Sequence, residues 1–298
     1  MMIDVKPSLT VVIPCYNRQD ELARALDSLV AQTDGAFDVV VCDDGSTDDI
    51  PAVVARYADR LSVTCLSIDN SGGPARPRNL GVAHSNAEWI SFLDSDDWWF
   101  PDRIAHVRAA LNDAVDIVYH RLRKHACDGS ADHGKPLPEM VGQDLNNSDP
   151  LRTMILHGNP VATSGATVRR TVLVESGGFC DDRTLASVED FDLWLRLAGS
   201  RKRFRYMPDV LGAYCTGGEH ISHFSTQYEK QRELFTRQLT TLPPSYVAMA
   251  RDRFEYLLGS YAVRLGRPEA ASHLRKVQYN AGWMTWTKAR AKLLRLPR

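Results

Sequence analysis

Trp89-Ile90-Ser91-Phe92-Leu93-Asp94-Ser95-Asp96-Asp97 is a short apolar segment that runs directly into three carboxylates. Its apolar half predicts a buried strand, and carboxylates gathered at a strand's end repel one another unless a cation or hydrogen-bond donors compensate. A divalent metal would provide that compensation, because Mg²⁺ and Mn²⁺ prefer oxygen ligands. The competing interpretation is an exposed acidic turn before a helix that begins near Pro101.

Apolar runs alternate with segments of helical spacing on both sides of this stretch. Strands are predicted at residues 9–13, 37–42, 61–66, 89–93 and 115–120, with helices between them. This alternation predicts an α/β fold with a doubly wound, mostly parallel sheet and helices on both faces. Function in such sheets lies at the carboxyl ends of the strands, where both Asp43-Asp44 and the Asp94–Asp97 cluster fall.

The second half of the chain is less regular. Residues 126–147 are polar and rich in Gly, Pro, Asp and His, which predicts a loop over the site. Strand-like runs follow at 161–168 and 204–214, with helices at 172–175 and 189–197, and only helices are expected from residue 224 onward. Residues 264–298 contain nine Lys or Arg and one Glu, interleaved with tryptophans and leucines.

Composition excludes several classes of protein. The chain has 298 residues, 44% of them hydrophobic, and a formal net charge of −1, which does not suit a general nucleic-acid binder. Six cysteines without a CxxC pair predict free thiols in a reducing compartment. No signal peptide or membrane span of about 18 apolar residues is expected, so the sequence predicts a cytoplasmic protein.

Four short motifs follow one another along the chain: residues 11–18 (VVIPCYNR), 43–46 (DDGS), 94–97 (DSDD) and Glu189-Asp190. With Gly72-Gly73-Pro74 leading into Arg78-Asn79-Leu80-Gly81, their order resembles that of the family 2 glycosyltransferases over roughly residues 8–215. The resemblance implies the Rossmann-like GT-A fold. It divides the chain into a catalytic domain, 1–223, and a basic helical extension, 224–298. The nucleotide-sugar half would be about 1–123 and the acceptor half about 148–223.

The resemblance assigns the donor's base to the ends of the first two strands. Pro14 ends the first strand, Tyr16 would stack on the base, and Asn17 would add a polar contact. Asp44 would accept a hydrogen bond from the ring N–H of uracil, which favours a UDP-sugar and leaves a dTDP-sugar open. The alternative for both segments is an ordinary polar turn.

By the same resemblance, Asp94 faces the ribose or donor sugar, and Asp96 binds the Mn²⁺ or Mg²⁺ that bridges the two phosphates. The departing nucleoside diphosphate gains negative charge, which a metal stabilises. Arg78 is a candidate contact to the nucleotide, because a guanidinium matches phosphate geometry.

The family comparison places the catalytic base at Asp190. Glu189 would be an orienting neighbour or a contact to the acceptor. Such a base takes the proton of the acceptor hydroxyl during a single, inverting displacement. The alternative is a well-formed helix start, since the helix dipole favours acids in a first turn.

The chain departs from the family after Tyr214, the residue that ends the predicted last strand. Many relatives carry a histidine a few residues later, where this chain has Gly217. His220 and His223 follow, and their part in a metal site stays open.

The expected function is therefore an inverting, metal-dependent hexosyltransferase of polysaccharide biosynthesis. It would move a sugar from a UDP-sugar to a hydroxyl of a saccharide or lipid-linked saccharide. The basic C-terminus would touch the cytoplasmic face of the inner membrane, or it would pack as a solvated helix. A catalytically inactive GT-A scaffold stays open as an alternative. A nucleotidyltransferase and a dinucleotide oxidoreductase are disfavoured, because no glycine-rich loop follows the first strand.

Overall fold

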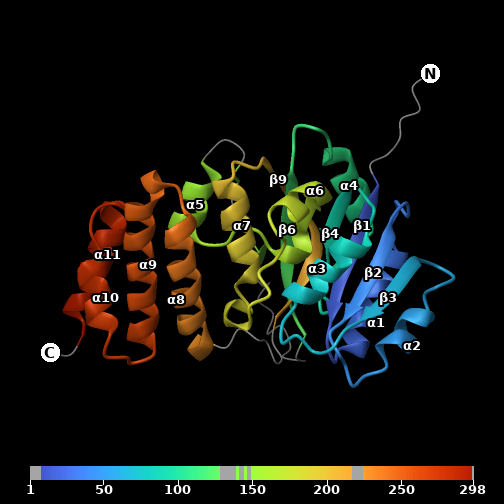
Figure 1. Cartoon of the computed structure of the whole chain (residues 1–298), viewed down its shortest axis with the longest axis horizontal. Helices are drawn as coiled ribbons and strands as arrows, with labels where there is room; N and C mark the ends of the chain where they lie inside the picture. Colours follow the sequence, from blue (N-terminus) through green and yellow to red (C-terminus); the bar gives the residue numbers. More distant parts are fainter. Residues whose placement is uncertain (1–7, 128–138, 141–143, 146–148, 217–223, 297–298) are drawn as a thin grey trace.

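The computed structural model describes residues 8–127, 139–140, 144–145, 149–216 and 224–296. A nine-stranded sheet forms the centre, in the order β3-β2-β1-β4-β8-β6-β9-β5, with β7 (Glu139–Met140) paired to β6. Figure 1 shows the first strands at one end of the molecule and the last helices at the other. The prediction of a mostly parallel α/β sheet with C-terminal helices is confirmed.

The first four strands of the sheet are parallel. They are β1 (Leu9–Cys15), β2 (Asp38–Asp43), β3 (Ser62–Ser67) and β4 (Trp89–Phe92). Strand β1 lies between β2 and β4, with Cys15 in register with Asp43. The carboxyl ends of these three strands therefore open onto one edge of the sheet, which brings the first three sequence motifs together.

Alternate residues of β1 face two separate cores, as expected for a strand that is covered on both sides. Val11 and Ile13 pack with the helices of one face, whereas Val12 packs with those of the other. The first face carries α1 (Gln19–Val30), α2 (Ile50–Ala55) and α4 (Arg103–Ala110). The second carries α3 (Ala75–His84), α6 (Arg170–Glu175) and α7 (Glu189–Gly199).

Helix α3 approaches the sheet closely because it has a glycine at the contact. A Cβ atom on Gly81 would lie 2.5 Å from Val12 Cγ1 and 3.2 Å from the Cys42 sulfur. Two residues earlier, Asn79 donates to the Phe179 carbonyl over 2.8 Å and accepts from the Phe179 N–H over 2.9 Å. These contacts fix the position from which Arg78 reaches the site.

The second half of the sheet is mixed. Strand β8 (Ala166–Arg169) runs antiparallel to β4 and to β6 (Ile117–Ala126), and β9 (Phe204–Thr216) runs parallel to β6. The short β5 (Trp98–Trp99) pairs antiparallel with β9, which folds the segment after the acidic cluster back onto the sheet. The pairing of β6 with β9 is irregular around Arg121, so both strands bend there.

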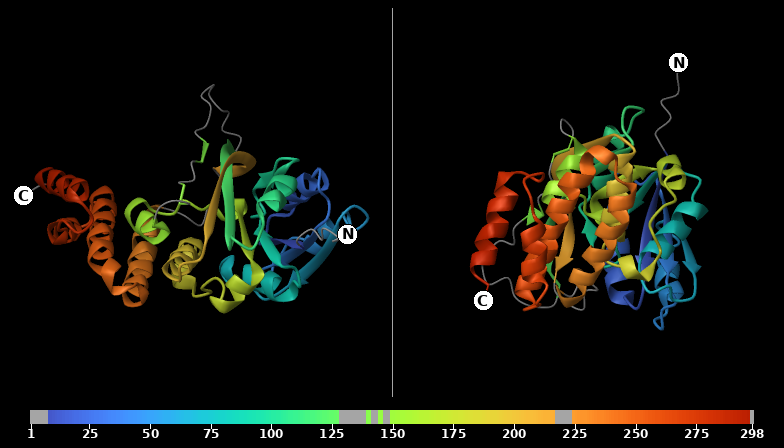
Figure 2. Two further views of the ribbon diagram at one scale, coloured as in Figure 1. Left: turned by 90° about the horizontal axis from the view of Figure 1, so that it is seen from above. Right: turned by 60° about the vertical axis from the view of Figure 1, so that its left-hand side comes forward.

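Helix α5 (Pro150–His157) and the C-terminal helices complete the molecule. Figures 1 and 2 show α8 (Phe224–Thr241), α9 (Pro244–Arg264), α10 (Ala270–Lys276) and α11 (Trp283–Leu294) grouped at one end. Phe235 and Phe254 stack at 3.7 Å between ring centroids and belong to the same core as Trp194 of α7. None of the helices in the described ranges combines the length and apolar character needed to cross a bilayer.

The prediction of six free thiols is wrong for one pair. The structure joins Cys127 and Cys215 by a disulfide, with 5.6 Å between their Cα atoms, and the other four cysteines are free. The two residues are 88 positions apart in sequence, but the pairing of β6 with β9 brings them together. Spacing along the chain could not reveal this neighbourhood.

Candidate active site

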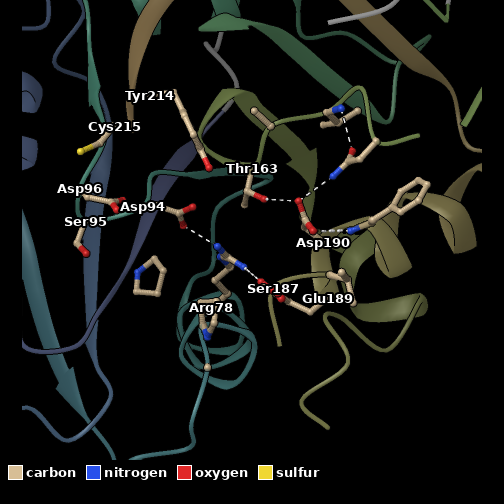
Figure 3. A pocket seen from close by; sticks show the side chains of 18 of the residues that line it. Arg78, Asp94, Ser95, Asp96, Thr163, Ser187, Glu189, Asp190, Tyr214 and Cys215 are labelled. Carbon is tan, nitrogen blue, oxygen red and sulfur yellow. Dashed lines mark hydrogen bonds and ion pairs between the residues drawn. The ribbon is translucent and has the colours of Figure 1, made fainter. Parts of the chain in front are cut away.

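One large pocket, with a volume of about 1200 Å³, opens at the carboxyl ends of β1, β2 and β4. It collects side chains from all four sequence motifs, and Figure 3 shows those of the third and fourth motifs with Arg78 between them. Every residue that the sequence analysis assigned to the donor, metal or base lines it: Pro14, Tyr16, Asn17, Asp44, Arg78, Asp94, Asp96 and Asp190.

One end of the pocket is built by the turns after β1 and β2. Tyr16 is 48% exposed, so its ring is accessible to a ligand. Asn17 has a left-handed backbone with φ of 50°, and its Oδ1 accepts from the Thr47 N–H over 2.7 Å. Asp44 is buried and accepts from the Ser71 N–H over 2.8 Å. These bonds hold both turns so that an aromatic ring and a carboxylate lie at the same end of the pocket.

The acidic cluster after β4 divides into two groups. Asp94 and Asp96 line the pocket, and Asp96 forms an ion pair with Arg18. Asp97 instead turns inward, where it is buried and accepts from the Cys215 N–H over 2.8 Å. Burial, followed by the negative charges of Asp96 and Asp94, raises the pKa of Asp97 well above its usual range. A raised pKa favours the neutral form of Asp97, whereas Asp94 and Asp96 each pair with an arginine.

Arg78 occupies the centre of the site. Its guanidinium donates to Asp94 Oδ1 over 2.6 Å and to Glu189 Oε1 over 2.8 Å, and Figure 3 shows it between the two carboxylates. Arg78 and Glu189 are both buried. One cation therefore joins the motif at the end of β4 to the motif at the start of α7.

The first turn of α7 presents its acids in two directions. Glu189 and Asp190 line the pocket, whereas Asp192 faces the helices behind it. Asp192 accepts from Arg196 over 2.8 Å and from Gln238 of α8 over 2.8 Å. Its role is to tie α7 to α8, and the acids of this turn also suit the positive end of the helix dipole.

Asp190 is held in a fixed orientation at the pocket wall. Its Oδ2 accepts from Asn159 Nδ2 over 2.9 Å, and its Oδ1 accepts from the Phe191 N–H over 2.7 Å. Burial, followed by the negative charge of Glu189, raises the pKa of Asp190 to about 7, although the positive charge of Arg78 opposes the shift. A carboxylate with such a pKa is matched to accepting a proton near neutral pH.

A single turn of 3₁₀ helix, η1 (Thr163–Gly165), connects the two sets of acids. The Thr163 hydroxyl lies 3.4 Å from Asp190 Oδ2, and the Ser164 hydroxyl accepts from the Asp94 N–H over 3.0 Å. The backbone of this turn is also held, because Trp99 Nε1 donates to the Ser164 carbonyl over 2.7 Å. The Trp99 side chain is buried, so it packs inside the fold and does not line the pocket.

The two arginines after the glycine-rich turn differ in position. Arg76 is exposed and does not line the large pocket, whereas Arg78 does. His220 and His223 lie outside the described residues. The sequence analysis assigned no role to several further lining residues, because their places depend on tertiary packing: Asn159, Thr163, Tyr214, Gln231, Arg253, Leu257 and Tyr261.

Among the described residues, no group of three or more His, Cys, Asp or Glu side chains is arranged to hold a metal ion. A divalent ion shared with a substrate diphosphate needs only one or two carboxylates from the protein. Asp94 and Asp96 fit that requirement, because both are hard oxygen donors that line the pocket. Their present partners, Arg78 and Arg18, are side-chain cations.

The chain resembles known proteins over most of its length. The profile of glycosyl transferase family 2 matches residues 10–175. Succinoglycan biosynthesis protein ExoU of Rhizobium meliloti is 30% identical over 243 residues, which are 75% of this chain and 68% of ExoU. Poly(ribitol-phosphate) beta-N-acetylglucosaminyltransferase TarS of Staphylococcus aureus is 26% identical over 219 residues, which are 72% of this chain but only 36% of TarS.

Solved structures show the same fold. Residues 1–349 of S. aureus TarS superpose with a TM-score of 0.68 at 21% identity, covering 96% of this chain and 88% of that one. The same protein has been solved with UDP and with UDP-GlcNAc. Mannosyltransferase PcManGT from Pyrobaculum calidifontis, in complex with GDP-Man and Mn²⁺, superposes with a TM-score of 0.59 at 21% identity, covering 98% and 88% of the two chains.

Proposed function

This chain belongs to glycosyl transferase family 2 and has the GT-A fold, and on that premise we propose that it is an inverting, metal-dependent hexosyltransferase. It takes a sugar from a UDP-sugar and attaches it to a hydroxyl of a saccharide or lipid-linked saccharide in polysaccharide biosynthesis. The observation that carries the proposal is that one pocket holds both the pocket-facing carboxylates after β4 and Asp190, whose pKa is raised to about 7.

The donor's nucleotide would lie against the turns after β1 and β2. Tyr16 offers a ring on which a base stacks, and Asp44 offers a carboxylate to the N–H of a uracil. Arg18 and Arg78 line the adjacent part of the pocket, where guanidinium groups suit a diphosphate. UDP is preferred to dTDP because the complex of TarS with UDP superposes on this chain with a TM-score of 0.62.

Asp96, with Asp94 beside it, would hold Mn²⁺ or Mg²⁺ together with the donor's phosphates. When bound, the ion stabilises the negative charge that develops on the departing diphosphate. Support comes from the oxygen donors that face the pocket and from PcManGT, which was solved with GDP-Man and Mn²⁺.

Asp190 would act as the general base. It takes the proton of the acceptor hydroxyl as that oxygen bonds to the anomeric carbon, while the bond from this carbon to the diphosphate oxygen breaks. The bonding electron pair leaves with UDP, and the single displacement inverts the anomeric centre. Asn159 and the Phe191 N–H keep the carboxylate aimed during this step.

Peripheral contact with an anionic membrane is a further part of the proposal. The outward side of α11 exposes Trp283 (67%), Met284 (58%) and Leu294 (88%), next to the exposed Lys288 and Arg295. Apolar side chains among cations suit the interface of an anionic leaflet. The membrane contacted would be the cytoplasmic face of the inner membrane.

Calorimetric titration with UDP, dTDP and GDP, each with and without Mn²⁺, tests the donor assignment. We expect Mn²⁺-dependent binding that favours UDP and is lost in Asp96→Ala. Asp190→Asn should bind UDP normally but transfer sugar about 10²- to 10⁴-fold more slowly. Normal transfer by this variant would remove Asp190 from the base role. Binding of none of the nucleotides would favour the alternative of an inactive scaffold.

A further inference from the structure

The C-terminal helices supply one wall of the active-site pocket. Gln231 of α8 and Arg253, Leu257 and Tyr261 of α9 all line it. The pocket volume of about 1200 Å³ also exceeds the roughly 300–1000 Å³ typical of a site for one small ligand. The cavity therefore has room for a second substrate beside the donor.

This wall lies on the side of the pocket that carries Asp190, the proposed general base. The last residue of α5 and the three that follow it, residues 157–160, line the pocket and include Asn159, which donates to Asp190. Helix α5 in turn packs against both α7 and α9. A substrate whose hydroxyl faces Asp190 thus extends toward α9, away from the turns that hold Tyr16 and Asp44.

Arg253 is the distinctive residue of the wall. It is half-buried, and it forms no hydrogen bond or ion pair with any residue in the described ranges. Within the described residues its Nε is buried without an acceptor, and its guanidinium carbon lies 5.3 Å from the centroid of the Tyr256 ring. Burial lowers the pKa of Arg253 from its usual value. A half-buried guanidinium without an acidic partner is costly unless a ligand provides the anion.

We propose that Gln231, Arg253, Leu257 and Tyr261 form the acceptor subsite, and that Arg253 binds an anionic group carried by the acceptor saccharide. Leu257 and Tyr261 offer an apolar surface to the faces of sugar rings, and Gln231 offers amide hydrogen bonds. The anion is a phosphate of a lipid-linked or polyol chain, or the carboxylate of an acidic sugar. The inference rests on the proposed function, since it assigns the second substrate of that reaction.

The test uses the full-length protein with saturating UDP and Mn²⁺, so that the donor's diphosphate site is filled. Glucose 1-phosphate, glucuronate and glucose are titrated by ligand-observed NMR against the wild type, Arg253→Gln and Arg253→Lys. Arg251→Gln is the matched control, because it removes the same charge from an exposed position of α9 outside the pocket.

We expect the wild type to bind at least one of the anionic sugars about tenfold more tightly than glucose. Arg253→Gln should lose this preference, Arg253→Lys should keep part of it, and Arg251→Gln should keep all of it. The sugar that binds more tightly then shows whether the acceptor's anionic group is a phosphate or a carboxylate. Equal binding of all three sugars by the wild type, or an undiminished preference in Arg253→Gln, would overturn the inference.

UDP binding is measured separately in each variant and should be unchanged. If UDP fails to bind even to the wild type, the donor assignment fails. The sugars are then titrated alone, and a preference that depends on Arg253 still supports an anion site at this wall.

Discussion

Arg78 Nη1 donates to Glu189 Oε1 over 2.8 Å, although the two residues are 111 positions apart in the sequence. Both side chains are buried, and Glu189 Oε2 has no hydrogen-bond partner in the described part of the chain. Arg78 also donates to Asp94, so its loss would leave two carboxylates without their cation. Arg78 therefore compensates the charges of both Glu189 and Asp94.

Replacing Arg78 with Met should destabilise the protein strongly. Removing one partner of a buried ion pair costs about 3–5 kcal/mol, because the other charge is left buried and unpaired. Chemical denaturation should show this loss for Arg78→Met. The control Arg76→Met, on the exposed side of the same helix, should change the free energy of unfolding by less than about 0.5 kcal/mol. Equal stability of the two variants would contradict the bridging role.

Glu189→Gln should move the pH dependence of transfer. Asp190 must be ionised to act as a base, so the wild-type rate should rise with pH through a pKa of about 7. The negative charge of Glu189 is one cause of that raised pKa, and Gln removes it. The rising limb of a pH–rate profile should therefore shift to lower pH. An unshifted limb would show that a different group titrates.

Asp190→Asn should stabilise the protein at alkaline pH. The folded pKa of about 7 lies above the unfolded value of about 3.9, so the folded state binds more protons between these values. Wild-type stability thus falls as pH rises from about 4 to 7, whereas Asn cannot ionise. The Tm at pH 8 should rise by about 2–4 °C for each kcal/mol recovered.

The same comparison at pH 4 should show little gain, because Asp190 is then protonated. Asp182→Asn is the control, and it should lower the Tm at pH 8. Hydrogen bonds from Arg237 and Thr184 depress the pKa of Asp182, so its ionised form stabilises the folded state. A Tm increase for Asp190→Asn that did not depend on pH would refute the ionisation argument.

Gly81→Ala should weaken the packing of α3 on the sheet. The added Cβ would lie 2.5 Å from Val12 Cγ1, so the helix or strand must shift, at a cost of about 1–3 kcal/mol. Gly35→Ala is the control, because a Cβ there meets no atom within 4 Å. Thermal unfolding should show a lower Tm for Gly81→Ala alone.

Liposome flotation tests the membrane contact. The wild type should float with vesicles that contain anionic lipid and stay unbound with neutral ones. Replacing Trp283 and Leu294 with Ser should abolish flotation, because these side chains are largely exposed on α11. Val174→Ser, which changes an exposed apolar residue of α6, should float as the wild type does. Flotation that is independent of lipid charge would remove the basic residues from the explanation.

Much of the donor side could be predicted from sequence, because parallel strands open their carboxyl ends onto one edge. Asp44 and Asp94 follow such strands, and both line the pocket. Asp97 shows the limit of this reasoning, since it is adjacent to Asp96 and yet turns inward to the Cys215 N–H. The direction of a side chain in a turn depends on what packs behind it.

The base side was harder to predict, because its contacts join distant segments. Asn159 and Thr163 reach Asp190 only after α5 and η1 pack beside α7. Arg253 follows Asp190 by more than sixty positions, and no motif marks it. Its place at the pocket depends on the docking of α9, which local periodicity does not reveal.

Thr163 and Ser164 are consecutive, and they touch the carboxylate of Asp190 and the backbone of Asp94 respectively. One peptide unit thus links the carboxylate of Asp190 to the backbone of Asp94. If these two residues act as proposed, any change that moved them apart would disturb both contacts. Changes of sugar or acceptor would then be expected in the surrounding walls, where helices α8 and α9 supply lining residues.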